Sequence, residues 1–171
     1  HYHGWTYALD GQLLSATEMG DAEGFDVGAV RLPQARVAQW QGFVFATLDV
    51  EAPALTEVLA GVDARIGGRG LESYRFQRRI AYDVACNWKV YIDNYLEGYH
   101  VPHIHPELNA MLDYRSYVID TAPWYSLQYS PLESGDALYG SGEALYYTIW
   151  PNTRCNILPG RLQTNRVLPL G

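Results

Sequence analysis

The stretch NWKVYIDNYLEGYHVPHIHPEL, residues 87–108, carries the most structural and chemical information in this 171-residue chain. It places five acidic or imidazole side chains within thirteen residues: Asp93, Glu97, His100, His103 and His105. Two histidines and one carboxylate are the protein ligands typical of a reactive iron centre that keeps open coordination positions. The stretch therefore predicts a site for such a metal.

Helical periodicity organises the first part of this stretch. On a helix that advances about 100° per residue, six apolar residues form one arc: Trp88, Tyr91, Ile92, Tyr95, Leu96 and Tyr99. Asp93, Glu97 and His100 fall together on the opposite side, at the spacing i, i+4, i+7. His105 is about 140° away from His100 on a straight helix. One unbroken helix could therefore not direct both histidines to one metal.

Pro102 offers a way to bring the two histidines together. Proline disfavours the helical region for the residue before it, so we expect the helix to end near His100 or Val101 and the chain to turn back. The alternative is an amphipathic helix whose acidic side faces water. Lys89 is the only Lys or Arg in the stretch, whereas a solvated face usually mixes both signs of charge. The spacing does not choose the metal, although H-x4-H differs from the zinc-protease pattern H-E-x-x-H.

A second motif stands at the amino terminus. HYHGWTY, residues 1–7, precedes Asp10-Gly11, which lies between apolar residues and predicts a hairpin turn. HYHGWTY resembles the second half of the Rieske ligand motif C-x-x-H-G-W, with the cysteine expected one position before His1. Residues 87–108 resemble the mononuclear-iron motif of Rieske non-haem iron oxygenase α subunits, the aromatic-ring-hydroxylating type. Two further matches follow the order of that family: WQGFVFATL at residues 40–48 and WPN at residues 150–152.

The resemblance implies an internal fragment of a longer α subunit. Of the four cluster ligands only His3 is in this chain, and the third iron ligand, a carboxylate on a later helix, is expected beyond Gly171. Residues 1–55 are expected to be part of a Rieske [2Fe–2S] domain, and residues 56–171 the N-terminal part of the mononuclear-iron catalytic domain. The implied fold class is α+β: the C-terminal part of a Rieske β-sandwich followed by part of a helix-grip (START-like) antiparallel sheet.

The resemblance also implies roles for individual residues. His100 and His105 match the iron ligands. Glu97 matches the acidic position that links the Rieske histidine of a neighbouring subunit to an iron-ligating histidine, where it would fix both imidazoles. Asp93, one turn earlier, is the alternative for that role, and Asn94 is expected to tune the iron rather than to ligate it.

The implied activity is that of an oxygenase. Electrons from NAD(P)H would pass through a reductase or ferredoxin to the [2Fe–2S] cluster and then to mononuclear Fe(II). With O2, the iron would hydroxylate a small organic substrate, in the first place an aromatic one. The full protein would be a homotrimer or an α3β3 assembly. His103 could be a spectator, a cavity wall or a misassigned ligand.

Three alternative functions stay open. A Rieske monooxygenase or demethylase could act on a quaternary ammonium compound such as choline or a betaine, and Trp124, Tyr125 or Trp150 could supply its aromatic cage. A zinc hydrolase would use His100, His105 and a carboxylate with water as nucleophile. A ligand-binding sheet without chemistry would explain the aromatic residues but not the histidines.

Composition narrows the setting of the protein. The net charge of −7 argues against a nucleic-acid partner. No apolar run approaches the roughly 20 residues of a membrane helix, so we expect a cytoplasmic protein without a membrane partner. Alternation and turn residues predict strands at 5–9, 13–15, 40–48, 71–85, 116–119, 124–130, 144–150 and 164–168, and a short helix at 55–59.

Overall fold

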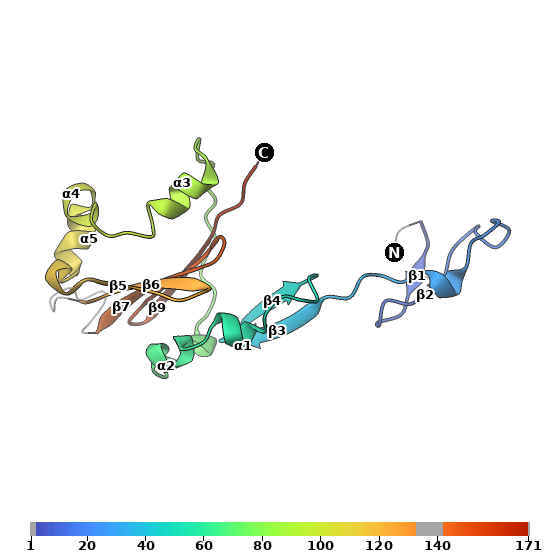
Figure 1. The fold of residues 1–171 in the computed structure, drawn as a ribbon, viewed down its shortest axis with the longest axis horizontal. Helices are drawn as coiled ribbons and strands as arrows, with labels where there is room; N and C mark the ends of the chain where they lie inside the picture. The colour runs from blue at the N-terminus through green and yellow to red at the C-terminus, as the bar shows by residue number, and fades with distance from the viewer. Residues whose placement is uncertain (1–2, 133–141, 171) are drawn as a thin grey trace. The chain divides into compact units, whose positions relative to one another are not determined.

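The structure, a computed structural model, describes residues 3–132 and 142–170. The chain divides into two compact units, His1–Leu55 and Thr56–Gly171. Both contain antiparallel strands, and most of the helices belong to the second unit (Figure 1). This mixture confirms the expected α+β class.

The first unit is built from two small hairpins. Its elements are β1 (Thr6–Tyr7), β2 (Leu13–Ser15), the 3-10 turn η1 (Val27–Ala29), β3 (Arg36–Trp40) and β4 (Phe43–Thr47). β1 and β2 pair antiparallel, and Gly11 in the turn between them has a φ of +89°, a conformation that glycine adopts without strain. The hairpin that Asp10-Gly11 predicts is therefore confirmed.

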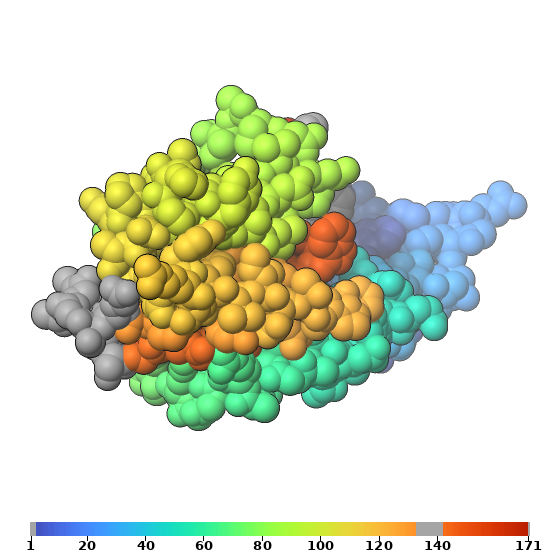
Figure 2. Space-filling model, turned by 60° about the vertical axis from the view of Figure 1, so that its left-hand side comes forward, coloured from blue at the N-terminus to red at the C-terminus, as the bar shows by residue number. Residues whose placement is uncertain are grey.

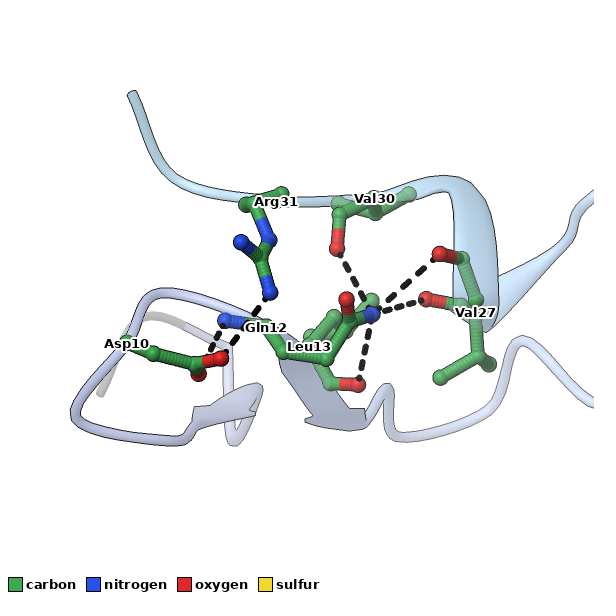
Figure 3. Close-up of polar contacts among 7 residues, drawn as sticks. Asp10, Gln12, Leu13, Val27, Val30 and Arg31 are labelled. Atoms are coloured by element: carbon green, nitrogen blue, oxygen red, sulfur yellow. Dashed lines mark hydrogen bonds and ion pairs between the residues drawn. The ribbon is translucent and has the colours of Figure 1, made fainter. Parts of the chain in front are cut away.

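Side-chain hydrogen bonds tie the β1–β2 hairpin to the segment around η1 (Figure 3). Asp10 accepts from the backbone N–H of Gln12 at 3.1 Å and from Arg31 Nη2 at 2.9 Å. The side-chain amide of Gln12 lies 3.3 Å from each of three carbonyl oxygens, those of Val27, Gly28 and Val30. These polar contacts hold residues 27–31 against the β1–β2 hairpin.

The prediction of one continuous strand at residues 40–48 is wrong. The structure has two strands, β3 and β4, joined by Gln41 and Gly42 with φ of +48° and +82°. Positive φ at both central residues is the geometry of a tight hairpin turn whose twist matches the strands. The sequence Gln-Gly is a weaker signal for that turn than Asn-Gly or Asp-Gly, so the break inside the apolar run was not anticipated.

The second unit is one antiparallel sheet with short helices. Its helical elements are α1 (Leu55–Val58, which begins at the unit boundary), α2 (Val62–Ile66), η2 (Leu71–Ser73), α3 (Trp88–Asp93), α4 (Val101–Ile104), α5 (Pro106–Met111) and η3 (Tyr114–Ser116). Its strands are β5 (Val118–Thr121), β6 (Tyr125–Pro131), β7 (Glu143–Ile149), β8 (Thr153–Leu158) and β9 (Arg161–Arg166). The strands pair in chain order to form a five-stranded meander. In the described part of the chain, no helix has the length and apolar character to cross a membrane.

One face of this sheet is covered by the segment that carries the histidines, as Figures 1 and 2 show. Because successive side chains of a strand point to opposite faces, Ala144 and Leu158 point toward that segment. They form a buried cluster with Leu112 and Leu132. Leu108, Tyr117 and Tyr146 pack against the cluster, so apolar burial holds α5 and the turn after it on the sheet.

The opposite face is covered by α2. The guanidinium of Arg65 on α2 lies 4.3 Å from the ring centroid of Tyr129 and is paired with Glu143 at 2.6 Å. Tyr125 on the same face donates to the carbonyl of Ala60 at 2.8 Å. The short helix expected at 55–59 is confirmed as α1.

The expected strand at residues 71–85 does not form in the described structure. After η2 the segment 74–84 has no regular secondary structure, and Phe76, Ile80 and Tyr82 are 83%, 54% and 79% exposed. Alternating apolar and polar residues suit one face of a sheet, but a strand also needs a neighbouring strand for its backbone hydrogen bonds. No described strand pairs with this segment.

Candidate metal centre

His100 and His105 come together because the backbone between them forms one very short helix, α4, and turns at His105 before α5 begins. His100 precedes α4, and His105 lies between α4 and α5 with φ −122° and ψ 69°. Their ring centroids are 5.1 Å apart and the ring planes are inclined by 74°. Two imidazoles at this separation and angle can direct one nitrogen each to a common metal ion. Their role as ligands remains a prediction.

The helix that was expected to continue to His100 is shorter than predicted. α3 ends at Asp93, and residues 94–100 form turns before α4 begins. Pro102 therefore stands in the first turn of a new helix instead of ending the previous one. Proline suits this position, since the first turn of a helix needs no N–H donor from it. The predicted outcome, a change of chain direction between the histidines, is reached by another route.

Glu97 holds the ring of His100 directly. Its Oε1 is hydrogen-bonded to His100 Nδ1, and its Oε2 accepts from the backbone N–H groups of Tyr99 and His100 at 2.7 and 3.3 Å. A carboxylate that engages one ring nitrogen fixes the tautomer and orientation of a ligating imidazole. This contact leaves Nε2 of His100 as the nitrogen available for a metal.

A cavity of about 110 Å³ lies beside the two histidines. Its wall is formed by Asn94, Tyr95, Glu97, His100, Val101, His105, Leu108, Leu112, Tyr117, Gln128 and Tyr146. Polar groups thus converge on an otherwise apolar and aromatic hollow, which is the usual constitution of a small-molecule site.

Hydrogen bonds join this wall to the sheet beneath it. Tyr117 donates its hydroxyl proton to Gln128 Oε1 at 2.5 Å. Gln128 donates through Nε2 to the backbone carbonyl of Tyr95, and the hydroxyl of Tyr95 donates to Asn156 Oδ1 at 2.6 Å. The turn segment 94–100 is therefore anchored to β6 and β8 by side chains from the sheet.

Arg154 supports the same turn segment from β8. Its side chain is fully buried, and its guanidinium carbon lies 3.9 Å from the ring centroid of Tyr95 and 4.6 Å from that of Tyr91. Its Nη2 also donates to the carbonyl of Tyr91 at 3.0 Å. Cation–π contacts of this kind are strongest when water is excluded. They fix the end of α3 from which the histidine-bearing turns begin.

Burial changes the acidity of two tyrosines of the wall. Burial is the main cause that raises the pKa of Tyr117, and the nearby Tyr146 raises it further. Burial likewise raises the pKa of Tyr95, against a smaller opposing effect of its hydrogen bond to Asn156. Both hydroxyls therefore stay protonated near neutral pH.

The remaining candidate residues take different positions. Asp93 ends α3 as an exposed side chain and is not in the cavity wall, whereas Asn94 is part of that wall. His103 is exposed and also outside the wall. Within the described residues, no group of three or more His, Cys, Asp or Glu side chains gathers around one point. His3 belongs to the other unit and has a φ of +50°.

Three wall residues on the sheet side were not anticipated: Tyr117, Gln128 and Tyr146. They lie outside the histidine motif, on or just before strands that carry many other polar and aromatic residues. The expected cage residues Trp124, Tyr125 and Trp150 are not in the described wall. Tyr125 points to the opposite face, and Trp150 is 62% exposed in the turn after β7. Strand register, which the composition did not reveal, decides which aromatic residues reach the cavity.

Gly98 is packed against Tyr117, so we expect Gly98→Ala to disturb the cavity. A Cβ at this position would lie 2.5 Å from Cε1 and 2.8 Å from Cζ of Tyr117, which would force the ring away from Gln128. Overpacking of this kind costs about 1–3 kcal/mol. Urea unfolding should show the loss. Gly20→Ala, where nothing lies within 4 Å of the added carbon, should leave stability almost unchanged, and equal effects of both changes would contradict the packing argument.

Comparison with known proteins agrees with this architecture. Residues 71–171 match the family described as ring hydroxylating alpha subunit, catalytic domain. The chain is 37% identical to the choline monooxygenase of Arabidopsis thaliana, over 99% of this chain and 44% of that protein. It is 37% identical to the glycine betaine monooxygenase oxygenase subunit of Chromohalobacter salexigens, over 66% of this chain and 25% of that protein.

A solved structure supports the same relationship. The structure of a quaternary ammonium Rieske monooxygenase that oxidises carnitine superposes with a TM-score of 0.78 at 28% identity, over 96% of this chain and 47% of that one. The chain thus spans about half the length of the relatives that it matches. With the family match, the identity over almost the entire chain and the shared fold, the chain belongs to the Rieske non-haem iron oxygenase family, as part of a ring-hydroxylating α subunit.

Proposed function

We propose that this chain supplies the iron-binding histidines and a substrate cavity of a monooxygenase that acts on a quaternary ammonium compound. The observation that carries the proposal is the composition of the cavity wall. His100 and His105 stand on one side, three tyrosines and Glu97 complete the wall, and no Lys or Arg is among its described residues. Such a wall suits a cation beside a metal.

The two histidines fit mononuclear iron. Their converging rings and the contact of Glu97 with His100 Nδ1 match an imidazole pair with a supported outer nitrogen. A third protein ligand would come from outside the described residues. When bound, Fe(II) with open positions activates O2, so that one oxygen atom replaces a substrate hydrogen by hydroxyl and the other leaves as water, with two electrons and two protons taken up.

The wall favours a cationic substrate for electrostatic reasons. Tyr95, Tyr117 and Tyr146 contribute aromatic rings to the wall, and aromatic faces attract quaternary ammonium groups. One face of Tyr95 is already occupied by the guanidinium of Arg154, which leaves Tyr117 and Tyr146 as the main candidates. Glu97 adds a formal negative charge at the same cavity. The relatives named above act on choline, glycine betaine and carnitine. These observations favour the ammonium alternative over the aromatic substrate expected first.

Electron supply completes the proposal. We assign His3 as one histidine of a [2Fe–2S] cluster, with electrons from NAD(P)H through a reductase. Inter-subunit electron transfer is stated for the carnitine-oxidising relative. We propose that Glu97 serves that transfer here, since its carboxylate already engages the ring of His100 and is itself about one-third exposed.

Oxygen uptake in a protein with the length of the relatives tests the proposal. The enzyme would be loaded with Fe(II), supplied with NADH and a reductase, and given choline, carnitine, glycine betaine or an arene such as naphthalene. We expect coupled O2 uptake and product with at least one ammonium compound, at a rate about tenfold or more above the arene, since a desolvated cation–π contact contributes about 1–2 kcal/mol. Turnover of the arene alone would overturn the proposal. Hydrolysis by the Zn(II)-loaded protein without O2 uptake would favour a hydrolase instead.

A further inference from the structure

Gln128 sets the direction of the hydrogen bonds in the cavity wall. Its Nε2 faces the backbone carbonyl of Tyr95, and a carbonyl oxygen can only accept, so the orientation of the amide is determined. Oε1 must then face Tyr117 and accept the hydroxyl proton of that residue across 2.5 Å. Gln128 is only 2% exposed, so water does not compete for these bonds.

Tyr117 consequently has no proton to offer a ligand. A phenol has one donor hydrogen, and this hydrogen is used by Gln128, so the oxygen of Tyr117 can only accept a further hydrogen bond. The close packing of its ring against Gly98 limits reorientation. The hydroxyl of Tyr95 likewise has no proton to offer a ligand, because it donates that proton to Asn156.

The charge of the described wall also disfavours a ligand that brings only acceptor groups. Glu97 contributes two acceptor oxygens and a negative charge, while neither Lys nor Arg is among the described lining residues. Arg154 stacks on the ring of Tyr95 but is not itself in the wall. On this side of the cavity a carboxylate would lie beside the negative charge of Glu97 and the acceptor oxygen of Tyr117, with no Lys or Arg among the described lining residues to balance it.

We propose that Tyr117, held as an acceptor by Gln128, selects a ligand that presents a hydrogen-bond donor, so that the enzyme takes a quaternary ammonium alcohol in preference to a quaternary ammonium carboxylate. This inference rests on the proposed function and adds a substrate class to it. The hydroxyl of the alcohol donates to Tyr117, while the ammonium group meets the tyrosine faces and Glu97. A carboxylate in the same place would face the acceptor oxygen of Tyr117 and the negative charge of Glu97, and the amide of Asn94 is a neutral donor that does not balance this charge.

Choline and glycine betaine form a matched pair of substrates for the test, since both carry a trimethylammonium group. The ratio of their kcat/KM values would be measured in the wild type, in Tyr117→Phe and in Gln128→Leu. We expect the wild type to prefer choline by at least about tenfold. Tyr117→Phe keeps the ring but removes the acceptor, and should lower the preference about five- to tenfold with iron content unchanged.

Gln128→Leu gives a readout that general structural damage would not produce. It releases the proton of Tyr117, which can then donate to a carboxylate, so kcat/KM for glycine betaine should rise while that for choline falls. Damage to the fold would lower both values. The controls are the same exchanges at exposed positions, Tyr82→Phe and Gln163→Leu, which should leave the ratio unchanged.

The outcomes separate the inference from the proposed function. A wild type that prefers glycine betaine, or a Tyr117→Phe variant with an unchanged ratio, would overturn the role of Tyr117. O2-dependent turnover of neither ammonium compound would refute the proposed function instead. If Gln128→Leu does not fold, Tyr117→Phe decides the question alone.

Discussion

Alanine at His100 or at His105 is expected to empty the metal site, whereas alanine at His103 is expected to leave it filled. The two rings lie 5.1 Å apart at the cavity, and the ring of His103 is exposed outside its wall. Loss of a direct ligand should exceed the roughly 100-fold upper range seen when an outer partner of a ligand is lost. Iron per protomer and O2-dependent product would both be measured in protein with the length of the relatives.

His103→Ala serves as the matched control, because it removes an imidazole from the same short segment. Iron retained after His105→Ala but lost after His103→Ala would show that the ligand pair is misassigned. Thermal unfolding of the iron-free proteins should be alike for all three variants. A large loss of stability in one of them would mean that its imidazole also supports the fold.

Glu97→Gln is expected to lower product formation by about 10- to 100-fold while most of the iron stays bound. The carboxylate accepts at both oxygens, from the ring of His100 on one side and from the N–H groups of Tyr99 and His100 on the other. Glutamine has one acceptor oxygen, so its NH2 group must face one of these donors. The charge that steadies the ring for electron transfer is lost as well.

Single-turnover reduction of the iron site, together with iron content and the Rieske spectrum, would locate the effect of Glu97→Gln. The slowed step should be electron arrival at the iron, with the cluster spectrum retained. Glu107→Gln on α5, an exposed position outside the cavity wall, is the matched control. Near-normal turnover in Glu97→Gln would transfer the role to Asp93, and loss of iron would make Glu97 a direct ligand.

The local part of the candidate site could be predicted from the sequence. Glu97, His100 and His105 lie within nine residues, and a few turns of backbone decide whether they meet. Pro102 correctly indicated that the chain changes direction between the histidines. The mechanism of the change differed, because Val101 before the proline is itself helical and Pro102 stands in the first turn of α4, where its missing N–H is not needed.

The non-local part could not be predicted. Tyr117, Gln128 and Tyr146 reach the cavity only because β5, β6 and β7 pair in one register, and a shift by one residue would have sent their alternate neighbours there instead. Segment 71–85 is the reverse case. Its alternating residues indicated a strand, but no strand in the described chain pairs with it. The sequence leaves the region around Cys155 open between a strand and a turn and does not delimit β8, because the buried Arg154 and Asn156 do not look like interior residues.

The wall of the cavity is built from two separate segments of the chain, and this has a consequence for evolution. The imidazoles and Glu97 lie on one short segment, whereas Gln128 and Tyr146 are supplied by strands further along the chain, with Tyr117 just before the first of them. Mutations in those strands can therefore change which molecule is accepted without touching the ligands of the metal. Related oxygenases can in this way differ in substrate specificity while they keep the same metal-binding segment.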